Sequence, residues 1–449
     1  MGNAALLVQH SGARLRYCKP WKRWLAWTGA NWERDERSQA QESAKQVLDQ
    51  WLVIAEKANS DTQSKAILQH YTRSRSGPHL AAMLTLAKSD PGMAILPDDF
   101  NEQPGHLATP QGFVDLNTGH VTTHRPTNLN QHVTSAAWET SADQPTPLWT
   151  SFLERVQPDP LVRDFLQAAI GYSILGAPTE QVMFLNYGDG MNGKSTFAET
   201  LGRVLGTYAR KANATIFMGS KSETRNDLAA LMGARIIWAA ETRSDGTLDE
   251  QMVKQITGGD TVTVRYLYGE FFQFQPTFVP WLLTNHRPGI KSMEHAMWRR
   301  IRLVPWRERL SDAEHVNGLV DLMSTTEASG ILRWAYAGCL RYRRDGLMIP
   351  PSMAAEVGEY RAEEDQIGQF LRDECMVGRS SSWVASSEIY AAYKAWCARW
   401  NTQPVGWKAL APRLVKEPGV LRDRITSKRI YRGIELSTSP IVTTRELMT

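Results

Sequence analysis

A glycine-rich run between an apolar stretch and a helix-forming stretch constrains the fold of this chain more than any other feature. The pattern G-x-x-x-x-G-K-[ST] is filled by Gly188, Gly193, Lys194 and Ser195. The apolar residues 182–185 predict a strand before the run, and the residues from Phe197 onward predict a helix after it. This order of strand, loop and helix predicts an α/β core with a parallel sheet, in which the loop opens the helix.

The chemistry of such a loop is phosphate binding. Glycines let backbone N–H groups curl around phosphate oxygens, and the helix N-terminus adds partial positive charge. We expect Lys194 to reach the β- and γ-phosphates of ATP, and Ser195 to ligate Mg²⁺. The remaining cradle residues are Asp189, Gly190, Met191, Asn192 and Thr196. The alternative is an incidental glycine-rich turn.

A second strand ends in an acid. Residues 236–239 are apolar, and Ala240 and Glu241 follow them. A carboxylate at the tip of a strand beside the loop can polarise the attacking water. The usual pattern has two acids here, and Ala240 stands where the first would be. We therefore expect Mg²⁺ to rely on Ser195, the phosphates and water, with Glu241 as the base or an indirect metal ligand. The alternative is a strand that ends in a surface glutamate.

Two further segments offer polar groups at strand ends. Asn285 follows the apolar run FVPWLLT and could hold the attacking water or sense the γ-phosphate, although asparagine is also common in turns. Arg299 and Arg300 precede another short strand, IRLVPW. One arginine that reaches the γ-phosphate of a neighbouring subunit would stabilise transition-state charge, and we prefer Arg300. Surface salt bridges are the alternative for both.

The regions on either side of this core have other patterns. Residues 14–36 predict a hairpin turning at 28–31, residues 38–75 predict two helices broken at Asn59 and Ser60, and residues 112–124 predict another hairpin. With 449 residues, the chain has room for about three domains. We predict an α+β domain over 1–147, an ATPase domain over 148–365 and a further domain over 366–449.

The tail combines a helical pattern with concentrated charge. Helices are expected over 386–400 and 406–416, followed by a hairpin that turns at 426–428, which is a winged-helix pattern. Residues 408–435 hold eight Lys and Arg against three Asp and Glu, a balance of +5 that exceeds the +4 of the whole chain. The candidate DNA contacts are Lys408, Arg413, Lys428 and Arg429. The alternative is a solvated basic face.

These motifs in this order resemble those of superfamily 3 helicases. The chain is most similar to the phage and plasmid primase–helicase family, which is related to the poxvirus primase–helicase, over residues 14–437. The resemblance implies an AAA+-like P-loop ATPase core that assembles as a hexameric ring, binds ATP between subunits and moves 3′ to 5′ on single-stranded DNA. It also implies a channel hairpin over residues 260–274, with DNA contacts from Arg265, Tyr266 and Tyr268. An ordinary hairpin with a tyrosine core is the alternative.

The expected function is that of an ATP-dependent replicative DNA helicase of a phage, plasmid or integrated mobile element. Its partners would be single-stranded and forked DNA, further copies of itself and a separate primase or polymerase, because no carboxylate set for primer synthesis stands in a convincing context. The alternative is a nucleotide-switched origin-binding initiator or loader without unwinding activity. The sequence has no signal or membrane-spanning stretch, so no membrane partner is expected. Its cysteine usage fits a reducing, cytoplasmic setting, in the host cytoplasm or nucleoid. The four scattered cysteines predict neither a zinc site nor disulfides.

Overall fold

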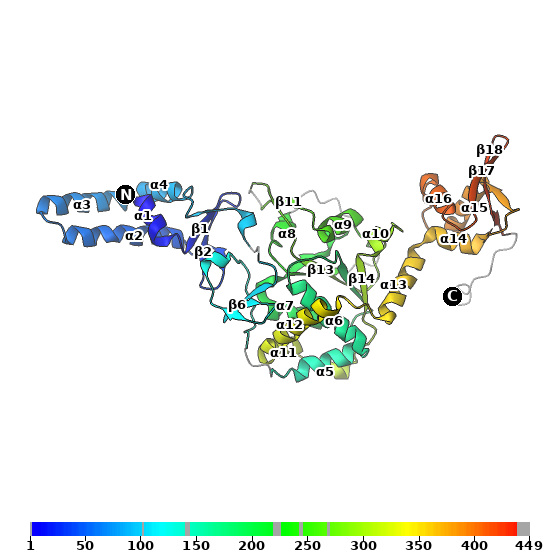
Figure 1. Ribbon diagram of the computed structural model, residues 1–449, viewed down its shortest axis with the longest axis horizontal. Helices are drawn as coiled ribbons and strands as arrows, with labels where there is room; N and C mark the ends of the chain where they lie inside the picture. Colours follow the sequence, from blue (N-terminus) through cyan, green and yellow to red (C-terminus); the bar gives the residue numbers. More distant parts are fainter. Residues whose placement is uncertain are drawn as a thin grey trace. The chain divides into compact units, whose positions relative to one another are not determined.

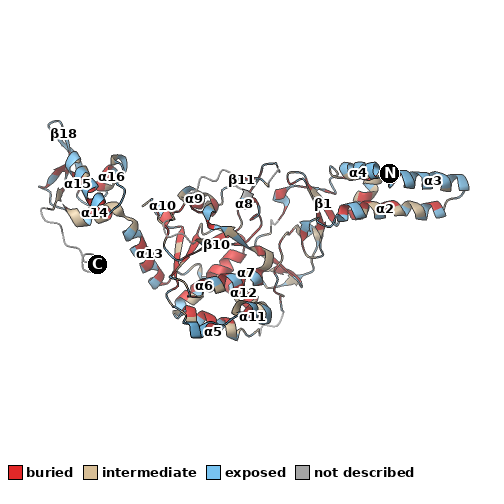
Figure 2. Cartoon of the chain, turned by 180° about the vertical axis from the view of Figure 1, so that it is seen from behind, coloured by how far each residue is buried: buried red, intermediate tan, exposed pale blue. Residues whose placement is uncertain are grey.

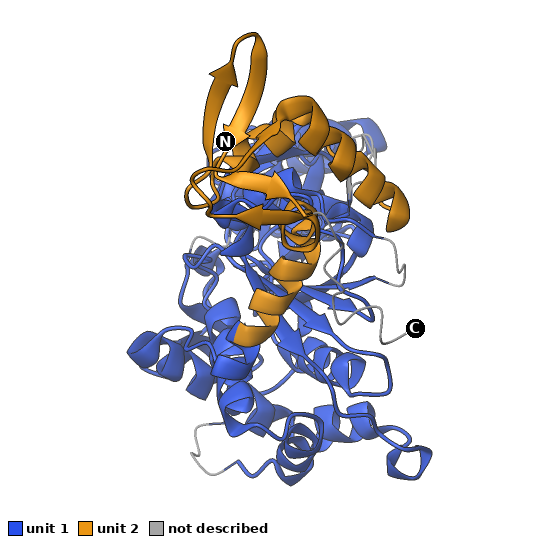
Figure 3. Cartoon of the chain, turned by 90° about the vertical axis from the view of Figure 1, so that its right-hand side faces the viewer, with its two compact units in different colours: residues 1–354 blue, residues 355–449 orange. Residues whose placement is uncertain are grey.

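The computed structural model describes residues 2–100, 103–139, 144–218, 226–241, 246–266 and 270–437. Packing divides the chain into two compact units, residues 1–354 and residues 355–449, which are coloured separately in Figure 3. The finer boundaries expected after residues 147 and 365 stay predictions.

The first unit begins with a small mixed sheet. Its strands are β1 (Leu15–Cys18), β2 (Arg23–Trp27), β3 (Trp32–Arg34) and β4 (Ala94–Ile95), in the order β3-β2-β1-β4. Strands β2 and β3 are antiparallel and pair Trp27 with Trp32, which confirms the turn predicted at residues 28–31. The predicted hairpin is one part of this sheet, because β1 also pairs antiparallel with β2.

Four helices accompany this sheet: α1 (Asn3–Ser11), α2 (Gln39–Glu56), α3 (Asp61–Ser74) and α4 (Gly77–Ala87). The predicted break between α2 and α3 is confirmed, and Ser60 caps α3 by accepting a hydrogen bond from the Gln63 backbone N–H. The buried stripe of α2, including Val47 and Leu48, packs in a cluster with α1 and α4. By contrast, α3 exposes most of its surface (Figure 2).

A second small sheet precedes the core. It contains β5 (His106–Thr109), β6 (Gly112–Asp115) and β7 (Val121–Thr122), all antiparallel. The hairpin predicted over 112–124 is confirmed, and Asp115 holds its turn by accepting hydrogen bonds from Asn117 and Thr118. Buried residues of β5 and β6 join the main hydrophobic core.

The centre of the first unit is a five-stranded parallel sheet. Its order is β14 (Ile301–Pro305), β8 (Met183–Tyr187), β13 (Val279–Thr284), β10 (Ile236–Glu241) and β9 (Ala209–Asn213). The predicted α/β core with a parallel sheet is therefore confirmed. The inner strands read as continuous apolar runs because both faces of such a sheet are covered. Figure 1 shows α6, α7 and α12 gathered on one side of the sheet.

The helices around this sheet are α5 (Pro147–Val156), α6 (Pro160–Ile174), α7 (Lys194–Leu205), α8 (Asn226–Ala229), α9 (Glu250–Gly258), α10 (His295–Trp298), α11 (Leu319–Thr326) and α12 (Ala328–Asp345). A hairpin of β11 (Val262–Val264) and β12 (Phe272–Phe274) follows α9. Helices α6 and α12 meet at Gly171 and Gly338, where a Cβ on Gly171 would lie 2.0 Å from the Gly338 carbonyl carbon. A larger residue at Gly171 would therefore force the two helices apart.

Short 3₁₀ helices span Pro97–Asp99, Pro126–Asn128, Gly206–Tyr208, Ala214–Ile216 and Asp312–Glu314. The aromatic side chains of the core form one stacked group. Trp281 stacks on Phe184 at 4.2 Å between ring centroids, and Phe197 contacts Trp149 and Trp306. Phe197 lies in the first turn of α7, directly after the glycine-rich loop, so its packing in this aromatic group anchors the loop to the core.

The second unit contains α14 (Gln366–Glu374), β15 (Cys375–Val377), β16 (Trp383–Ala385), α15 (Ser386–Arg399), α16 (Trp407–Leu414), β17 (Leu421–Ile425), β18 (Lys428–Arg432) and β19 (Ile434–Leu436). Helix α13 (Pro351–Glu364) crosses the boundary between the units. The predicted succession of two helices and a hairpin is confirmed. Its core is built from Phe370, Ile389, Tyr393, Leu410 and Leu414.

The four cysteines are buried and unpaired. Within the described residues, no helix is both long and apolar enough to cross a membrane.

Candidate functional site

The glycine-rich loop connects β8, an inner strand of the sheet, to the start of α7. Its glycines have positive φ angles, +154° at Gly188, +91° at Gly190 and +84° at Gly193, and Met191 has a φ of +49°. Glycine adopts these angles at little cost, so the loop can turn tightly. The nine predicted cradle residues thus lie in a single turn and the first residues of α7.

Close packing also requires glycine at both ends of the loop. A Cβ on Gly188 would lie 2.2 Å from the Trp306 carbonyl oxygen, and one on Gly193 would lie 2.7 Å from Val156 Cγ1. The backbone of the loop therefore lies against the segment that follows β14 and against α5.

Lys194 is held inside this loop. Its Nζ donates to the Gly188 carbonyl oxygen at 2.5 Å and to Asn192 Oδ1 at 3.0 Å, and its exposed fraction is 5%. Asn192 is fixed in turn, because its Nδ2 donates to the Trp306 carbonyl oxygen at 2.9 Å. Burial lowers the pKa of Lys194 to about 8, and the nearby Asp189 opposes this effect. The positive charge of Lys194 is buried and has only neutral hydrogen-bond partners, so an anion bound beside it would be strongly attracted.

The first turn of α7 presents further groups beside Lys194. Ser195 is exposed and Thr196 is half-buried. The first N–H groups of a helix have no intrahelical acceptor and form its positive end. Hydroxyl and N–H groups therefore gather where the sequence predicts phosphates and a metal ion.

The predicted water-activating residues lie at the same edge of the sheet as the loop. In the parallel register Glu241 pairs with Thr284, and Thr284 pairs with Tyr187, the last residue of β8. Asn285 directly follows Thr284 and is exposed. The sheet thus brings the ends of β8, β10 and β13 together, as parallel strands require. Among the described residues, no group of three or more His, Cys, Asp or Glu side chains could hold a metal ion.

The two predicted arginines have different environments. Arg300 is 9% exposed, and its guanidinium donates to Thr257 Oγ1 at 3.1 Å and to the Ala296 carbonyl oxygen at 2.5 Å. Burial, followed by the charge of Arg299, lowers the pKa of Arg300. Arg299 is exposed, and its Nη2 donates to Gln181 Oε1 at 2.7 Å. Arg300, the arginine preferred from the sequence, is therefore buried and hydrogen-bonded within its own chain, whereas Arg299 is exposed.

Both arginines lie at the edge of the sheet opposite to the loop. They directly precede β14, whose first residue Ile301 pairs with Met183 at the start of β8, whereas Pro305 pairs with Tyr187 at its end. The length of the strand separates Arg299 from the loop of its own chain.

The hairpin predicted to enter a channel divides its side chains between two environments. Tyr266 packs on Trp21 and Phe272, lies under the Arg23 guanidinium and donates from its hydroxyl to the Ala229 carbonyl oxygen at 3.0 Å. Its ring is thus engaged in packing, as the alternative of a tyrosine core expected. Arg265 is exposed, and its guanidinium lies 4.9 Å from the centroid of the Phe271 ring. Tyr268 lies outside the described residues.

Sequence reasoning missed two participants in this hairpin. Phe271 is 66% exposed and contacts Arg265, and Trp21, in the turn between β1 and β2, packs against Phe272. Residues 14–36 were predicted only as a local hairpin, whereas Trp21 packs against a second hairpin more than 200 positions later in the sequence. The neighbouring Lys22 also forms an ion pair with Glu270 at 2.8 Å.

A further missed residue lies at the edge that carries the loop. The Arg287 guanidinium lies 5.1 Å from the centroid of the Tyr187 ring, so it lies beside the end of β8. Its signal in the sequence was its place two residues after Asn285 in TNHRP. It adds a cation to the edge where the loop, Glu241 and Asn285 gather.

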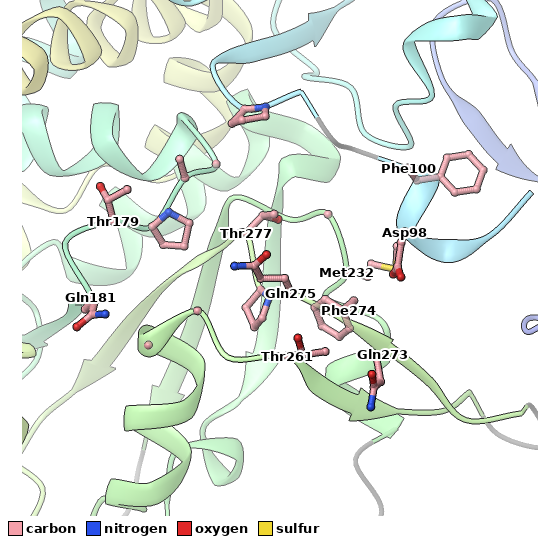
Figure 4. A pocket seen from close by; sticks show the side chains of 18 residues that line it. Asp98, Phe100, Thr179, Gln181, Met232, Thr261, Gln273, Phe274, Gln275 and Thr277 are labelled. Carbon is pink, nitrogen blue, oxygen red and sulfur yellow. The ribbon is translucent and has the colours of Figure 1, made fainter.

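A cavity of about 720 Å³ lies at the amino edge of the sheet, away from the loop. Figure 4 shows Gln181, Thr277 and Gln275 lining it, with Phe274 and Asp98. Of the described residues that line it, Asp98 is the one ionisable group. The cavity lacks the positive charge that a phosphate requires, so we do not regard it as the nucleotide site.

The predicted DNA contacts of the second unit also differ from one another. Arg413 forms ion pairs with Asp365, at 3.0 Å, and with Glu417. Lys408, Lys428 and Arg429 are exposed. Arg413 therefore holds α16 within its own unit, whereas the other three point to solvent.

Comparison with known proteins adds an independent observation. The family described as "D5 N terminal like" matches residues 4–158, and a family of unknown function, DUF5906, matches residues 186–300. "Putative helicase L207/L206" of Acanthamoeba polyphaga mimivirus is 27% identical over 265 residues, which are 55% of this chain and 28% of that protein. "Putative helicase 022R" of Frog virus 3 is 26% identical over 55% of this chain and 27% of that protein.

"Putative primase C962R" of African swine fever virus is 22% identical over 56% of this chain and 28% of that protein. The matched stretch is therefore little more than a quarter of the length of these relatives. Among solved structures, the C-terminal region of NrS-1 superposes with a TM-score of 0.56 at 8% identity, covering 96% of this chain and 99% of that chain. This likeness concerns the fold alone.

Proposed function

Because this chain belongs to the D5-like primase–helicase family, we propose that it is an ATP-dependent DNA helicase of superfamily 3 that acts in DNA replication. Its parallel α/β sheet would be an AAA+-like P-loop core, and its second unit would include a winged-helix domain. The protein would assemble as a ring, with six subunits expected, and would move 3′ to 5′ along single-stranded DNA.

One observation carries this proposal: Lys194 is buried within a glycine-built loop that joins an inner strand of a parallel sheet to a helix. The loop residues 188–193 and the first turn of α7 would hold the phosphates of ATP. Lys194 would exchange its contact with the Gly188 carbonyl oxygen for one with a phosphate oxygen, because the anion is the stronger partner.

The donor groups at this edge fit a magnesium–nucleotide complex. Ser195 offers a hydroxyl and Glu241 a carboxylate, and hard oxygen ligands of this kind are those that Mg²⁺ prefers. Since Mg²⁺ usually keeps several waters and takes further oxygens from phosphates, two protein groups suffice. When bound, the ion would neutralise charge on the β- and γ-phosphates. Glu241 would accept a proton from the attacking water, and Asn285 would orient that water.

The opposed positions of loop and arginines support assembly into a ring. Four residue steps of β14 span about 13 Å at the usual rise of a strand. Arg299 would therefore not reach the phosphates bound by its own chain, but it could reach those of a neighbour. Of the two arginines, we now favour Arg299 as the one that acts in trans, because its guanidinium is exposed and Arg300 is buried.

The β11–β12 hairpin would contact the translocating strand. Arg265 can pair with a phosphate and the exposed ring of Phe271 can stack on a base, which together are the contacts that single-strand binding uses. Tyr266 would support the hairpin from within. Movement of the hairpin after each hydrolysis would then pull the strand through the ring.

The test is a forked-duplex unwinding assay with measurement of ATP hydrolysis, and particle imaging with a slowly hydrolysed ATP analogue. We expect DNA-stimulated hydrolysis, strand displacement and ring-shaped particles. Lys194→Ala should strongly reduce the first two, and Lys211→Ala, which removes an exposed lysine from β9, should keep both. A wild-type protein that stays monomeric and does not hydrolyse ATP would refute the proposal.

The excess positive charge of residues 408–435 favours a second candidate, an origin-binding initiator or loader without unwinding activity. Such a protein would bind duplex DNA in a nucleotide-dependent way. It would hydrolyse ATP without displacing a strand, which separates it from the helicase in the same assay.

A further inference from the structure

The second unit contains a cleft of about 630 Å³ between α16 and the β17–β18 hairpin. Its basic lining residues are Lys408, Arg422, Arg424 and Arg429, and its one acidic lining residue among those described is Asp423. All four basic residues are exposed. The cleft therefore collects four cations on a surface open to solvent.

The acids of this segment are already paired with other bases. Asp423 accepts a hydrogen bond from Arg432, which lowers the pKa of its carboxyl group. Glu417 pairs with Arg413, and Glu435 pairs with Arg379 at 3.3 Å. Within the described part of the chain, none of the four basic residues of the cleft forms an ion pair. Its charge is thus left uncompensated.

The strand register places two of these arginines directly against each other. Arg424 faces Arg429 across the antiparallel β17–β18 pair, and Arg422 faces Tyr431 on the same side of the hairpin. Like charges directly opposite each other destabilise a sheet. Every residue of β17 is exposed, so packing does not require arginine at these positions. An anion between the two guanidinium groups would relieve the repulsion.

Two helix starts add to the positive potential. Trp407 and Lys408, the first residues of α16, line the cleft, and so does Ser386, the first residue of α15. Helix N-termini carry partial positive charge and unsatisfied N–H groups, and they bind phosphate readily. The side chains and both helix ends therefore favour the same kind of ligand.

We propose that this cleft binds the phosphodiester backbone of DNA through Lys408, Arg422, Arg424 and Arg429. The inference rests on the proposed function for the identity of the polyanion and assigns the DNA contacts of its second unit. It adds Arg422 and Arg424 to the residues predicted from sequence and gives Arg413 a structural role. Since phosphate contacts fix position without reading bases, the cleft holds the unit on DNA of any sequence.

The experiment measures DNA binding by the full chain without nucleotide, by fluorescence anisotropy across a range of salt concentrations. The probes are a short labelled duplex and the single strand of the same sequence. The double variant Arg424→Ala/Arg429→Ala should lower the slope of log affinity against log salt by about 2, since each phosphate contact contributes about 0.9. Two contacts change log affinity by about 1.8 for each tenfold change in salt, so with equal binding at 1 M salt the double variant should bind roughly 60-fold more weakly at 0.1 M.

Lys416→Ala is the matched control, because it removes an exposed cation of the same unit that does not line the cleft, and it should bind like wild type. Weaker binding by the double variant to one probe alone identifies whether the cleft holds duplex or single-stranded DNA. Equal affinity and equal salt slope for wild type and double variant, on both probes, would overturn the inference.

Lys194→Ala separates this inference from the proposed function. It should bind both probes like wild type in the absence of nucleotide, because Lys194 belongs to the first unit. If Arg424→Ala/Arg429→Ala loses DNA binding and the wild-type protein does not hydrolyse ATP, the results support the cleft and refute the helicase. Normal binding by the cleft variant in a protein that unwinds forks would do the reverse.

Discussion

The two edges of the central sheet carry opposite chemistry. At the carboxyl edge, the glycine-rich loop, Lys194, Glu241 and Asn285 follow the ends of three neighbouring strands. At the amino edge, arginines precede the strands: Arg300 before β14 and Arg235 before β10 are both buried. Arg299, which directly precedes Arg300 in the chain, is exposed.

This difference indicates how the proposed reaction would be divided between subunits. The carboxyl edge offers what holds and polarises a nucleotide, but the arginines that would complete the transition state are a strand length away. Parallel strands always place their starts and ends at opposite edges, so a single chain would not bring the two sets together. If the proposed function is correct, assembly would therefore be a condition of catalysis.

The largest expected effect concerns the amino edge. Arg299→Ala should lower the rate of ATP hydrolysis by about 10³-fold or more, because an arginine supplied in trans contributes that much in related phosphoryl transfers. Nucleotide affinity and melting temperature should stay unchanged. Mixing Arg299→Ala with Lys194→Ala should restore part of the activity, since some interfaces would then combine an intact loop with an intact arginine. No recovery on mixing would argue against the division between edges.

A somewhat smaller effect is expected at the carboxyl edge. Lys194→Ala should reduce hydrolysis by roughly 10²- to 10³-fold, as the loss of one charge-stabilising donor does in other enzymes. Unlike Arg299→Ala, it should also weaken ATP binding, which titration calorimetry would measure. If its ATP affinity matched that of wild type, Lys194 would not touch the phosphates.

Arg300→Ala tests whether the two arginines really differ. Because Arg300 donates within its own chain to Thr257 and Ala296, its loss should lower the free energy of unfolding by about 2 kcal/mol. Chemical denaturation would show this, with Arg299→Ala as the control of equal charge. If Arg300→Ala instead abolished hydrolysis and left stability unchanged, Arg300 would be the arginine that acts in trans.

The smallest effect is a dependence of ATP affinity on pH. Burial lowers the pKa of Lys194 to about 8. Above this pH the Lys194 ammonium of the free protein loses its proton and therefore the positive charge that attracts the phosphates. ATP affinity should therefore fall as pH rises through 8. It should be about tenfold weaker at pH 9 than at pH 7. Lys194→Arg should remove this dependence, because arginine stays charged, and a pH dependence that persisted there would assign it to another group.

Much of this architecture was predictable because it depends on local patterns. The loop, its flanking strand and helix, the break at Ser60 and the hairpin of residues 112–124 were each predicted and confirmed. Glycine, capping residues and apolar periodicity act over a few residues, so the sequence displays them directly. The parallel sheet followed from the alternation of strands and helices.

Other features depend on partners far away in the sequence. Tyr266 was expected to face DNA, but its ring packs on Trp21, which lies in the turn between β1 and β2. Arg413 was expected to contact DNA, but it pairs with Asp365. The sequence shows that a side chain is basic or aromatic, but it does not show whether that side chain is exposed or is paired with another residue.

Local sequence therefore determined the phosphate-binding type of loop, through glycines that allow a tight turn and a lysine at the start of a helix. Only the tertiary structure decided which of two adjacent arginines is buried. It also decided which basic residues of the cleft in the second unit form no ion pair with an acidic residue among those described. The reason is that burial and ion pairing depend on three-dimensional neighbours, and neighbours such as Thr257 and Arg300 stand 43 residues apart in the chain.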